Sequence, residues 1–563
     1  MFKKNDSHKQ LTIDMYSVDD MSVFFDNVKE TEFYTFYELV FCKIDEELFK
    51  SLFCENNGRP NSAVNAMMSA LILKSKHDWT YKELFFHLHF NIAVRAAIGL
   101  SAYEKVPFNE ATLFNFQNRV KDYSEKSKIN LFEKVFNTLT QDQLKTLKVK
   151  TNIARTDSLM IDSNIREYGL LQLLIEIVLR LYRAMEDSDK KLFCEQYAKY
   201  TEKTSEKYIY DIKGSDLPHE FTNVSNMYFW IKSNMSEKYK ETSEYKAFER
   251  GLNDFFILEN SEKAVIKKPK DIRSDAIQSP DDLDATYRCK RGEKHHGHSL
   301  SVTETANLDN KVNLITNVNV SKNNVDDSVI LNEIIEEVKE QMPDLEKIFV
   351  DGAYGSIDND KKLEQLDITM YQSAVKGKNS EVEFKFEKQD HLMFITCPQN
   401  QRIECETTKK GNFKAAFDKN VCSQCPLKDL CPAKNRKTKR LLYFDTDYIQ
   451  KKERHQRFSL LSDKEKNIRP NVEATVKEFS CRTDDHKLRV RGYFKTTVFA
   501  FTTAIAINFG RIFRYKVKEP LTLLFLFILT LFKLLKNQKY IIQKMKTRYY
   551  FWTDNLLSKA KID

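Results

Sequence analysis

Apolar residues recur with a helical period in the first part of the chain. Residues 63–76 form one helix-like segment, and Asn109 is placed to cap another. The apolar face of this second helix contains Leu113, Phe116 and Val120. Residues 1–145 are therefore predicted to be mostly helical. Short helices with tight connections can form a helix-turn-helix reader of DNA, although a plain helical bundle has the same periodicity.

The pattern changes after this helical region. Residues 148–163 predict a strand that leads into Asp157, and residues 165–270 return to a helix-rich, highly charged sequence. Polar and apolar positions then alternate from His298 to Thr305 and again from Leu314 to Val320. Alternation of this kind indicates two strands.

A helix and a third strand follow. Asp326 or Ser328 can cap the helix, and the apolar face at four-residue spacing holds Ile330, Ile334, Val338 and Met342. The apolar run 348–350 then ends at Asp351. A strand that ends in an acidic residue is a common way to hold a catalytic group on rigid backbone. The series of strand, strand, helix and strand predicts an α/β core.

Two further segments complete the chain. Residues 381–445 contain cysteines and basic residues, and residues 462–516 are predicted to be helical and include Glu473. The net charge of the chain is +9, and the stretch from Lys487 to Arg548 contains fourteen Lys or Arg residues and one acid. Such a surface suits a polyanion, although a solvated basic tail has the same composition.

The composition narrows the class of protein. With 41% hydrophobic and 30% charged residues, the chain is expected to be soluble and globular. The N-terminus lacks the apolar segment of a secretory signal, so the ten cysteines favour free thiols or a metal site over disulfides. The apolar run Leu521–Phe532 is shorter than the ~20 residues of a spanning helix, which favours a buried or partner-facing helix. No membrane association is expected.

Asp157, Asp351 and Glu473 form the candidate chemical centre. Cleavage and transfer of a phosphodiester need an activated oxygen nucleophile and a stabilised leaving oxygen. Two Mg²⁺ ions about 3.5–4 Å apart serve both needs, and carboxylate oxygens are their natural ligands. The plain alternative is that both aspartates cap turns and that Glu473 pairs with Lys477 one helical turn later.

A group of cysteines predicts a second metal site. Its four members are Cys397, Cys422, Cys425 and Cys431. A C-x2-C pair with two further cysteines suits a closed, tetrahedral, structural Zn²⁺ site. Cys405 competes as the fourth ligand, and unligated thiols are the alternative. The basic residues of 434–440, which include Arg436 and Lys437, can lie along a phosphate backbone.

Three histidines in the sequence K-H-H-G-H resemble a metal-binding tract. They are His295, His296 and His298. Because they open a predicted strand in a basic context, surface exposure or DNA contact is the favoured interpretation. An approach of His298 to the active site is the alternative.

Several segments, in this order, resemble the DDE transposases encoded by bacterial insertion sequences. T-D-S-L-M-I-D-S-N-I, which contains Asp157, is similar to the first-aspartate motif. Residues 278–287 resemble the segment that leads into the second core strand, and L-I-T-N-V-N-V-S-K-N-N-V-D-D-S resembles the strand and helix start that follow. V-D-G-A-Y-G-S, which contains Asp351, is similar to the second-aspartate motif. R-P-N-V-E-A-T-V-K, which contains Glu473, is followed by R-V-R-G-Y-F-K and A-I-N-F-G-R and resembles the glutamate helix and its basic sequel.

The resemblance covers most of the chain and implies a fold. The implied class is an α/β core, ribonuclease-H-like, with a mixed sheet flanked by helices, an α-helical N-terminal domain and a small zinc-type insertion. In this branch a large insertion precedes the final glutamate. The expected domains are an N-terminal DNA-binding domain (1–145), the first part of the catalytic core (148–380) with a helical insertion at about 165–270, a cysteine-rich zinc insertion (381–445), the final catalytic helices (446–516) and a basic and apolar helical tail (517–563).

The resemblance also implies an activity. Asp157, Asp351 and Glu473 would hold two Mg²⁺ or Mn²⁺ ions for cutting the ends of a mobile element and joining them to a target. The expected partners are double-stranded DNA and a second copy of the chain, in the bacterial cytoplasm at the nucleoid. The residues expected to contact DNA are Arg469, Lys477, Arg489, Arg491, Lys495, Arg436 and Lys437.

The chain departs from the Tyr-Arg-Glu-Lys signature that many relatives keep around the glutamate. Arg469 and Glu473 have the expected spacing, but Lys466 stands at the tyrosine position and Ser480 at the lysine position. Lys477 is the candidate substitute for that lysine. Asp162, five residues beyond Asp157, is a rival for the first ligand.

Three other functions are open to such a sequence. One is a metal-dependent nuclease that does not join DNA. Another is a catalytically inactive DNA-binding protein derived from a transposase. The third is a zinc-stabilised regulator, for which the core motifs would have no explanation.

Overall fold

The computed structural model describes residues 1–6, 31–54, 58–100, 105–259, 263–290, 292–373, 382–389, 392–408 and 411–534. Side chains are described through residue 517, apart from that of residue 259. The chain divides into two compact units, Met1–Ile507 and Asn508–Asp563. The run Leu521–Phe532 has helical backbone, but its side chains are outside the described part, so the prediction that it is buried stays a prediction.

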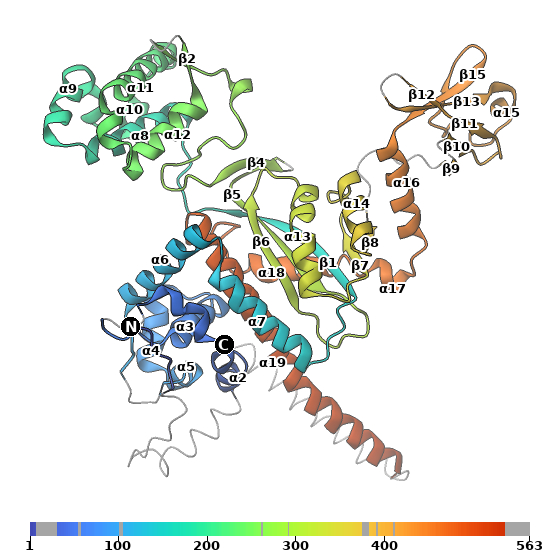
Figure 1. The fold of residues 1–563 in the computed structure, drawn as a ribbon, viewed down its shortest axis with the longest axis horizontal. Helices are drawn as coiled ribbons and strands as arrows, with labels where there is room; N and C mark the ends of the chain where they lie inside the picture. Colours follow the sequence, from blue (N-terminus) through green and yellow to red (C-terminus); the bar gives the residue numbers. More distant parts are fainter. Residues whose placement is uncertain are drawn as a thin grey trace. The chain divides into compact units, whose positions relative to one another are not determined.

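A six-stranded mixed sheet forms the centre of the first unit (Figure 1). Its strands are β1 (Ile153–Asp162), β4 (Thr286–Lys290), β5 (Glu293–Thr305), β6 (Ile315–Lys322), β7 (Lys347–Val350) and β8 (Thr369–Gln372). The strand order is β4-β5-β1-β7-β8, and β6 pairs with β5. Strands β1, β4, β5 and β6 pair antiparallel, whereas β7 and β8 are parallel to β1.

The strand predictions hold, with one correction. Asp157 was predicted to follow its strand, but it lies inside β1 and faces Val302 across the pair with β5. Asp351 directly follows β7, as predicted. The strand continues past Asp157 because β5 offers a backbone partner to every residue of β1 from Ala154 to Asp162.

Two helices connect consecutive strands on this side of the sheet. They are α13 (Asp327–Gln341), between β6 and β7, and α14 (Ile357–Gln365), between β7 and β8. The predicted apolar face of α13 is buried and packs against Ala154 of β1 and Ile348 of β7. Asp326 is the N-cap residue but makes no side-chain capping hydrogen bond, and Ser328 lies inside the helix.

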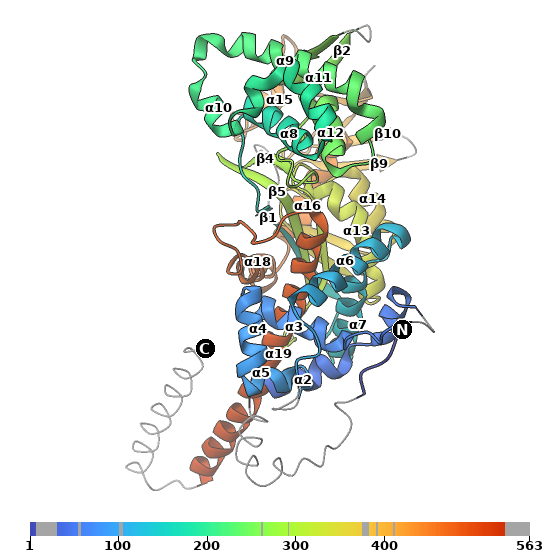
Figure 2. The same ribbon diagram turned by 90° about the vertical axis from the view of Figure 1, so that its left-hand side faces the viewer.

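The N-terminal region is helical, as predicted. Its helices are α2 (Glu32–Leu39), η2 (Phe41–Lys43), η3 (Glu46–Leu52), α3 (Val64–Lys76), α4 (Tyr81–Phe90), α5 (Ile92–Ala97), α6 (Glu110–Ser127) and α7 (Leu131–Thr146). The side chain of Asn109 caps α6 by accepting a hydrogen bond from the Thr112 amide at 2.9 Å. The helix α19 (Tyr493–Leu534) passes beside α3 (Figure 2), where Ser75 Oγ and Thr502 Oγ1 are 2.7 Å apart.

The helix-rich segment between β1 and β4 builds a core of its own, drawn green in Figure 1. Its elements are α8 (Leu170–Ala184), α9 (Asp187–Thr201), α10 (Ser205–Asp211), η4 (Gly214–Asp216), α11 (Leu217–Tyr239), α12 (Ser243–Phe255), β2 (Phe256–Glu259), β3 (Lys263–Ile266) and η5 (Pro269–Asp271). Tyr228 is fully buried there and donates to the Leu174 carbonyl at 3.0 Å. Gly251 lets α12 approach α8 closely, because a Cβ would lie 3.1 Å from Ile177 Cδ1.

The cysteine segment folds as two small antiparallel sheets, drawn orange in Figure 1. The strands are β9 (Lys385–Gln389), β10 (Leu392–Thr396), β11 (Arg402–Glu404), β12 (Glu406–Thr407), β13 (Phe413–Asp418), β14 (Lys434–Asn435) and β15 (Lys439–Phe444), with the short helix α15 (Lys419–Ser423). Phe384, Ile395 and Phe417 are among the residues of its core.

The final helices lead back to the sheet. They are α16 (Thr446–Ser459), α17 (Asp463–Lys466), α18 (Val472–Ser480) and α19. The guanidinium of Arg454 on α16 is fully buried and pairs with Asp360 of α14 at 3.2 Å. The region 462–516 is not continuously helical as predicted. Leu488 N donates to Asp162 O at 2.9 Å, so the chain after α18 adds to the end of β1 instead of forming a helix.

One helix in the described part of the chain, Tyr493–Val517, is long and apolar enough to span a membrane. Most of its apolar stretch is buried inside the protein. Thr496, Ala504 and Ile505 are among its buried residues. A helix covered in this way is typical of the core of a soluble protein.

Candidate active site

The three predicted carboxylates meet around one arginine. Arg469 Nη2 is 2.8 Å from Asp157 Oδ2 and 3.9 Å from Asp351 Oδ2. Arg469 Nη1 is 2.9 Å from Glu473 Oε1. Glu473 therefore pairs with the arginine one turn before it, whereas the plain alternative named Lys477. Side chains from a strand, a loop and a helix converge on one guanidinium.

The sheet explains why the two aspartates are neighbours. Parallel pairing places Arg155 of β1 opposite Phe349 of β7, so Asp157 and Asp351 follow at matching positions two residues later. Because β7 ends at Val350, the Asp351 side chain is on a loop, where it accepts a hydrogen bond from the Ala353 amide at 2.7 Å. Asp351 thus caps a turn and also contributes to the cluster.

The cluster runs from the interior to the surface. The exposed fraction of the side chain is 13% for Asp157, 35% for Asp351 and 68% for Glu473. Burial raises the pKa of Asp157, and Asp351 and Asp327 add to this rise, while Arg469 and the Ser158 amide oppose it. One side of the cluster is therefore open to solvent.

A buried network fixes the glutamate helix to the strand of Asp157. Glu304 of β5 is fully buried and accepts hydrogen bonds from Arg155 Nε at 2.6 Å and from Thr475 Oγ1 at 2.7 Å. Arg155 Nη1 also donates to the Ile468 carbonyl at 3.1 Å. Arg155 is two residues before Asp157, and Thr475 is two residues after Glu473. The network thus sets the position of one ligand candidate relative to the other.

We expect Thr475→Val to loosen this attachment. The substitution keeps the shape of the side chain but removes one hydrogen bond to a buried carboxylate, which should lower the free energy of unfolding by about 1–3 kcal/mol. Thr475→Ser keeps the donor and should retain most of the stability. Denaturant unfolding of both variants checks the prediction, and equal stability of Thr475→Val and the wild type would show that the hydroxyl contributes nothing.

Sequence reasoning missed Arg155, Glu304 and Thr475. Their contacts join positions 149 and 171 residues apart, which no local pattern specifies. The sequence held a weak indication of the buried role of Glu304. It occupies a position in the alternating strand where the pattern predicts an apolar, inward-facing residue. A buried acid of this kind needs a partner.

Asp162 and the histidines lie outside the cluster. Asp162 ends β1, and its Oδ1 accepts a hydrogen bond from the His296 amide at 3.0 Å. The surface interpretation of the histidine tract is wrong for His295 and His298, whose exposed fractions are 7% and 1%. His298 Nε2 is 3.7 Å from the buried Asp282 Oδ2. The tract is buried because β5 is an inner strand that pairs on both sides.

The basic residues named from the sequence differ in their surroundings. Lys477 and Lys495 are exposed, as are Arg436 and Lys437 in the turn between β14 and β15. Arg489 Nη2 is 2.9 Å from Asp78 Oδ2, and Arg491 Nη1 is 3.0 Å from Asp281 Oδ1. Both arginines are about half exposed in spite of these pairs, at 52% and 53%.

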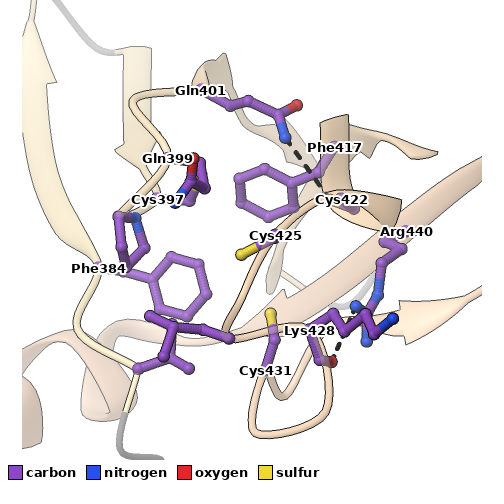
Figure 3. A pocket seen from close by; sticks show the side chains of 13 residues that line it. Phe384, Cys397, Gln399, Gln401, Phe417, Cys422, Cys425, Lys428, Cys431 and Arg440 are labelled. Carbon is purple, nitrogen blue, oxygen red and sulfur yellow. Dashed lines mark hydrogen bonds between the residues drawn. The ribbon is translucent and has the colours of Figure 1, made fainter. Parts of the chain in front are cut away.

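The four predicted cysteines line one small cavity of ≈ 20 Å³ (Figure 3). The thiols of Cys425 and Cys431 point into it, and Gln401 Nε2 is 3.5 Å from Cys422 Sγ. A cavity of this size holds about one water-sized occupant. Cys405 is not among the lining residues; it is buried in the core of the segment, and burial raises its pKa to about 11.

Neither cluster is arranged as a finished metal site. Within the described residues, no group of three or more His, Cys, Asp or Glu side chains is placed to hold a metal ion. In the carboxylate cluster the Arg469 guanidinium lies among the acids. The donor chemistry nevertheless fits, because carboxylate oxygens are the ligands of Mg²⁺ and Mn²⁺ and thiolates are those of Zn²⁺.

Adjacent strands of a mixed sheet bring two aspartates to a glutamate on a helix, and together these residues define a solvent-exposed site centred on carboxylates. Comparison with protein families gives the particular class. Residues 396–513 match the transposase DDE domain, and residues 26–119 match a transposase domain (DUF772). The two matches together support a DDE transposase of an insertion sequence. The first match includes Glu473 and the four cavity cysteines, whereas Asp157 and Asp351 lie before it.

No curated protein and no solved structure matches the chain. The family identification carries general properties with it. Transposases act on DNA, and DDE domains are nuclease and transferase domains that use divalent metal ions.

Proposed function

We propose that this transposase cuts DNA at the ends of its insertion sequence and joins the freed ends to target DNA. Asp157, Asp351 and Glu473 are the proposed ligands of two Mg²⁺ or Mn²⁺ ions. The observation that carries the proposal is the convergence of these three carboxylates on Arg469 at 2.8, 3.9 and 2.9 Å. Three carboxylates around one guanidinium leave an excess of negative charge, which attracts divalent cations.

The sheet supports a ribonuclease-H-like core. Three antiparallel strands, β6, β5 and β1, continue into the parallel strands β7 and β8, with helices α13 and α14 as connections. Asp157 is on β1, Asp351 directly follows β7, and Glu473 is on α18. Rigid elements therefore hold the reacting groups, which is what positioning catalysis needs.

The bound ions would activate the attacking oxygen and stabilise the leaving oxygen of the phosphodiester. The protein's own residues do the rest. Asp157 and Asp351 hold fixed positions through the sheet, and the network of Glu304 and Thr475 holds Glu473. The exposed Lys477 and Lys495 can neutralise phosphates close to the site. The first step frees a 3′-hydroxyl at the element end, and the second uses this hydroxyl to attack the target.

The other parts of the chain are assigned by their surfaces. We assign DNA binding to the helical region 1–145 and phosphate contacts to Arg436 and Lys437 of the cysteine segment. Two element ends must be held together for joining, so the complex on DNA is a homodimer. The place of action is the bacterial cytoplasm, at the nucleoid.

A Mg²⁺-dependent assay on labelled DNA that carries the element's own ends tests the proposal. Purified protein should release the ends and give joined products with a target plasmid. Cleavage without joined products would identify a nuclease instead. Binding without cleavage would identify an inactive, transposase-derived DNA-binding protein.

We further propose that Cys397, Cys422, Cys425 and Cys431 bind one structural Zn²⁺. Support comes from their shared cavity, which has room for one small occupant, and from the closed four-thiolate set. Cys425 and Cys431 already point into this space (Figure 3). Bound zinc would stabilise the cysteine segment, whose hydrophobic core is small.

Cys425→Ser should therefore lose bound zinc and lower the melting temperature, because binding energy of a structural zinc is folding energy. We expect about one zinc per chain in the wild type by elemental analysis. Cys405→Ser is the matched control, since this cysteine is in the same segment but outside the cavity, and it should keep its zinc. Absence of zinc from wild-type protein prepared with Zn²⁺ would contradict the assignment.

A further inference from the structure

A fourth carboxylate lies beside the proposed metal ligands. Asp327 is the first residue of α13, and its exposed fraction is only 5%. Its Oδ1 accepts a hydrogen bond from Ser158 Oγ at 2.7 Å. Ser158 is the residue next to Asp157 on β1. An acid in the first turn of a helix is common, but such acids normally stay in solvent, so the burial of Asp327 against the sheet needs another explanation.

A buried hydroxyl marks the same place. Tyr354, three residues after Asp351, is fully buried, and its hydroxyl has no hydrogen-bond partner among the described residues. Burial raises the pKa of this hydroxyl, the charges of Asp327, Asp157 and Asp351 raise it further, and the neighbouring Ser158 side chain lowers it. A buried hydroxyl without a hydrogen-bond partner can donate to a ligand or to ordered water.

The geometry of β1 explains how Asp327 reaches the cluster. Successive side chains of a strand point to opposite faces, so Asp157 and Ser158 diverge. Arg155 and Asp157 point to the face of α18, where they contact Ile468 and Arg469. Ala154 and Ser158 point to the face of α13. Asp327 therefore approaches from the side of the sheet opposite Glu473, at the point where β7 has ended.

We propose that Asp327 is a fourth carboxylate ligand of the divalent-cation site, with the Tyr354 hydroxyl as a hydrogen-bond donor to the ligands on this side. The assignment rests on the proposed function of the Asp157, Asp351 and Glu473 cluster and extends it. Its ligand is a hard divalent cation, Mg²⁺ or Mn²⁺, because all donors are oxygens. Four carboxylates from both faces of the sheet would enclose the cation more fully than three from one face.

The test compares Asp327→Asn with Asp326→Asn, an exposed neighbour with the same change of charge. Mn²⁺ binding is measured by electron paramagnetic resonance on the complex with an end-bearing DNA duplex, with DNA alone as the blank. Asp327→Asn should raise the Mn²⁺ concentration at half-saturation by about 10–100-fold, and Asp326→Asn should leave it unchanged. Unchanged Mn²⁺ affinity in Asp327→Asn would overturn the ligand assignment, whether or not cleavage falls.

A second variant, Asp327→Cys, keeps the assignment testable if Asp327→Asn fails to fold. Asp327→Cys supplies a thiolate, so its cleavage should be lost with Mg²⁺ and recovered with the softer ion Mn²⁺ or Cd²⁺. The assignment would also be overturned if no metal ion restored cleavage by Asp327→Cys while Asp326→Cys stayed active. Asp351→Ala separates this inference from the proposed function. If wild type and Asp351→Ala bind Mn²⁺ equally, the whole cluster is not a metal site; if only Asp351→Ala loses Mn²⁺, the cluster stands without Asp327.

Discussion

Asp351→Ala is expected to abolish Mg²⁺-dependent cleavage of the element ends while binding of those ends is retained. The carboxylate lies at the edge of the sheet beside Asp157 and is 35% exposed, so its removal leaves no buried cavity and should not unfold the protein. Loss of an electrostatic contact made in the transition state costs about 10²–10³-fold in rate, and loss of a metal ligand should cost at least that. A gel assay of cleavage beside a fluorescence assay of DNA binding measures both properties.

Asp358→Ala is the matched control for this experiment. Asp358 is a nearby exposed acid in the first turn of α14 and contributes the same charge to the local surface. Its replacement should leave cleavage and binding unchanged. Full cleavage activity in Asp351→Ala would remove Asp351 from the catalytic group, and equal losses in both variants would point to general electrostatics instead of ligation.

The local parts of the fold could be read from the sequence. The alternation in β5 and β6, the apolar face of α13 and the acid directly after β7 each depend on residues close together in the chain. Asn109 as a helix cap is of the same kind, since its partner is Thr112. The proposed ligands could be predicted for the same reason. Their motifs are short, and each motif belongs to one element.

Contacts between distant elements could not be read in this way. His298 looked like a surface residue because its neighbours in sequence are basic, yet the pairing of β5 with strands on both sides places it in the interior. Asp327 belonged to a stretch interpreted only as a helix start, and its contact with Ser158 spans 169 residues. The break after α18 depends on Asp162, whose backbone accepts the Leu488 amide.

Arg469 gives the second large effect. The sequence assigned it to phosphate contact, but its guanidinium is the cation among Asp157, Asp351 and Glu473, and only 14% of its side chain is exposed. In the proposed site, divalent ions would compete with this guanidinium for the same oxygens. DNA phosphates at the cleavage site offer Arg469 another partner, and bidentate arginine–phosphate contacts are strong. Entry of the end DNA would therefore release the carboxylates for metal binding.

Arg469→Ala should separate metal binding from catalysis. Without DNA, the variant should bind Mn²⁺ more tightly than the wild type, because no internal cation competes, and its melting temperature should rise more steeply with Mg²⁺. Without metal it should be less stable, since Asp157 is buried and would lose its partner. Cleavage should fall by about 10²-fold, because the phosphate contact is lost.

Arg469→Lys is the informative control, since it keeps the charge but cannot bridge two carboxylates through one planar group. We expect its Mn²⁺ affinity to lie between those of the wild type and Arg469→Ala. If Arg469→Ala instead binds Mn²⁺ more weakly than the wild type, the arginine supports the ligands and does not compete for them. The Mn²⁺ affinities of the wild type and the two variants are measured by calorimetry with and without end DNA. Their order distinguishes a guanidinium that occupies the position of the metal from one that only orients the carboxylates.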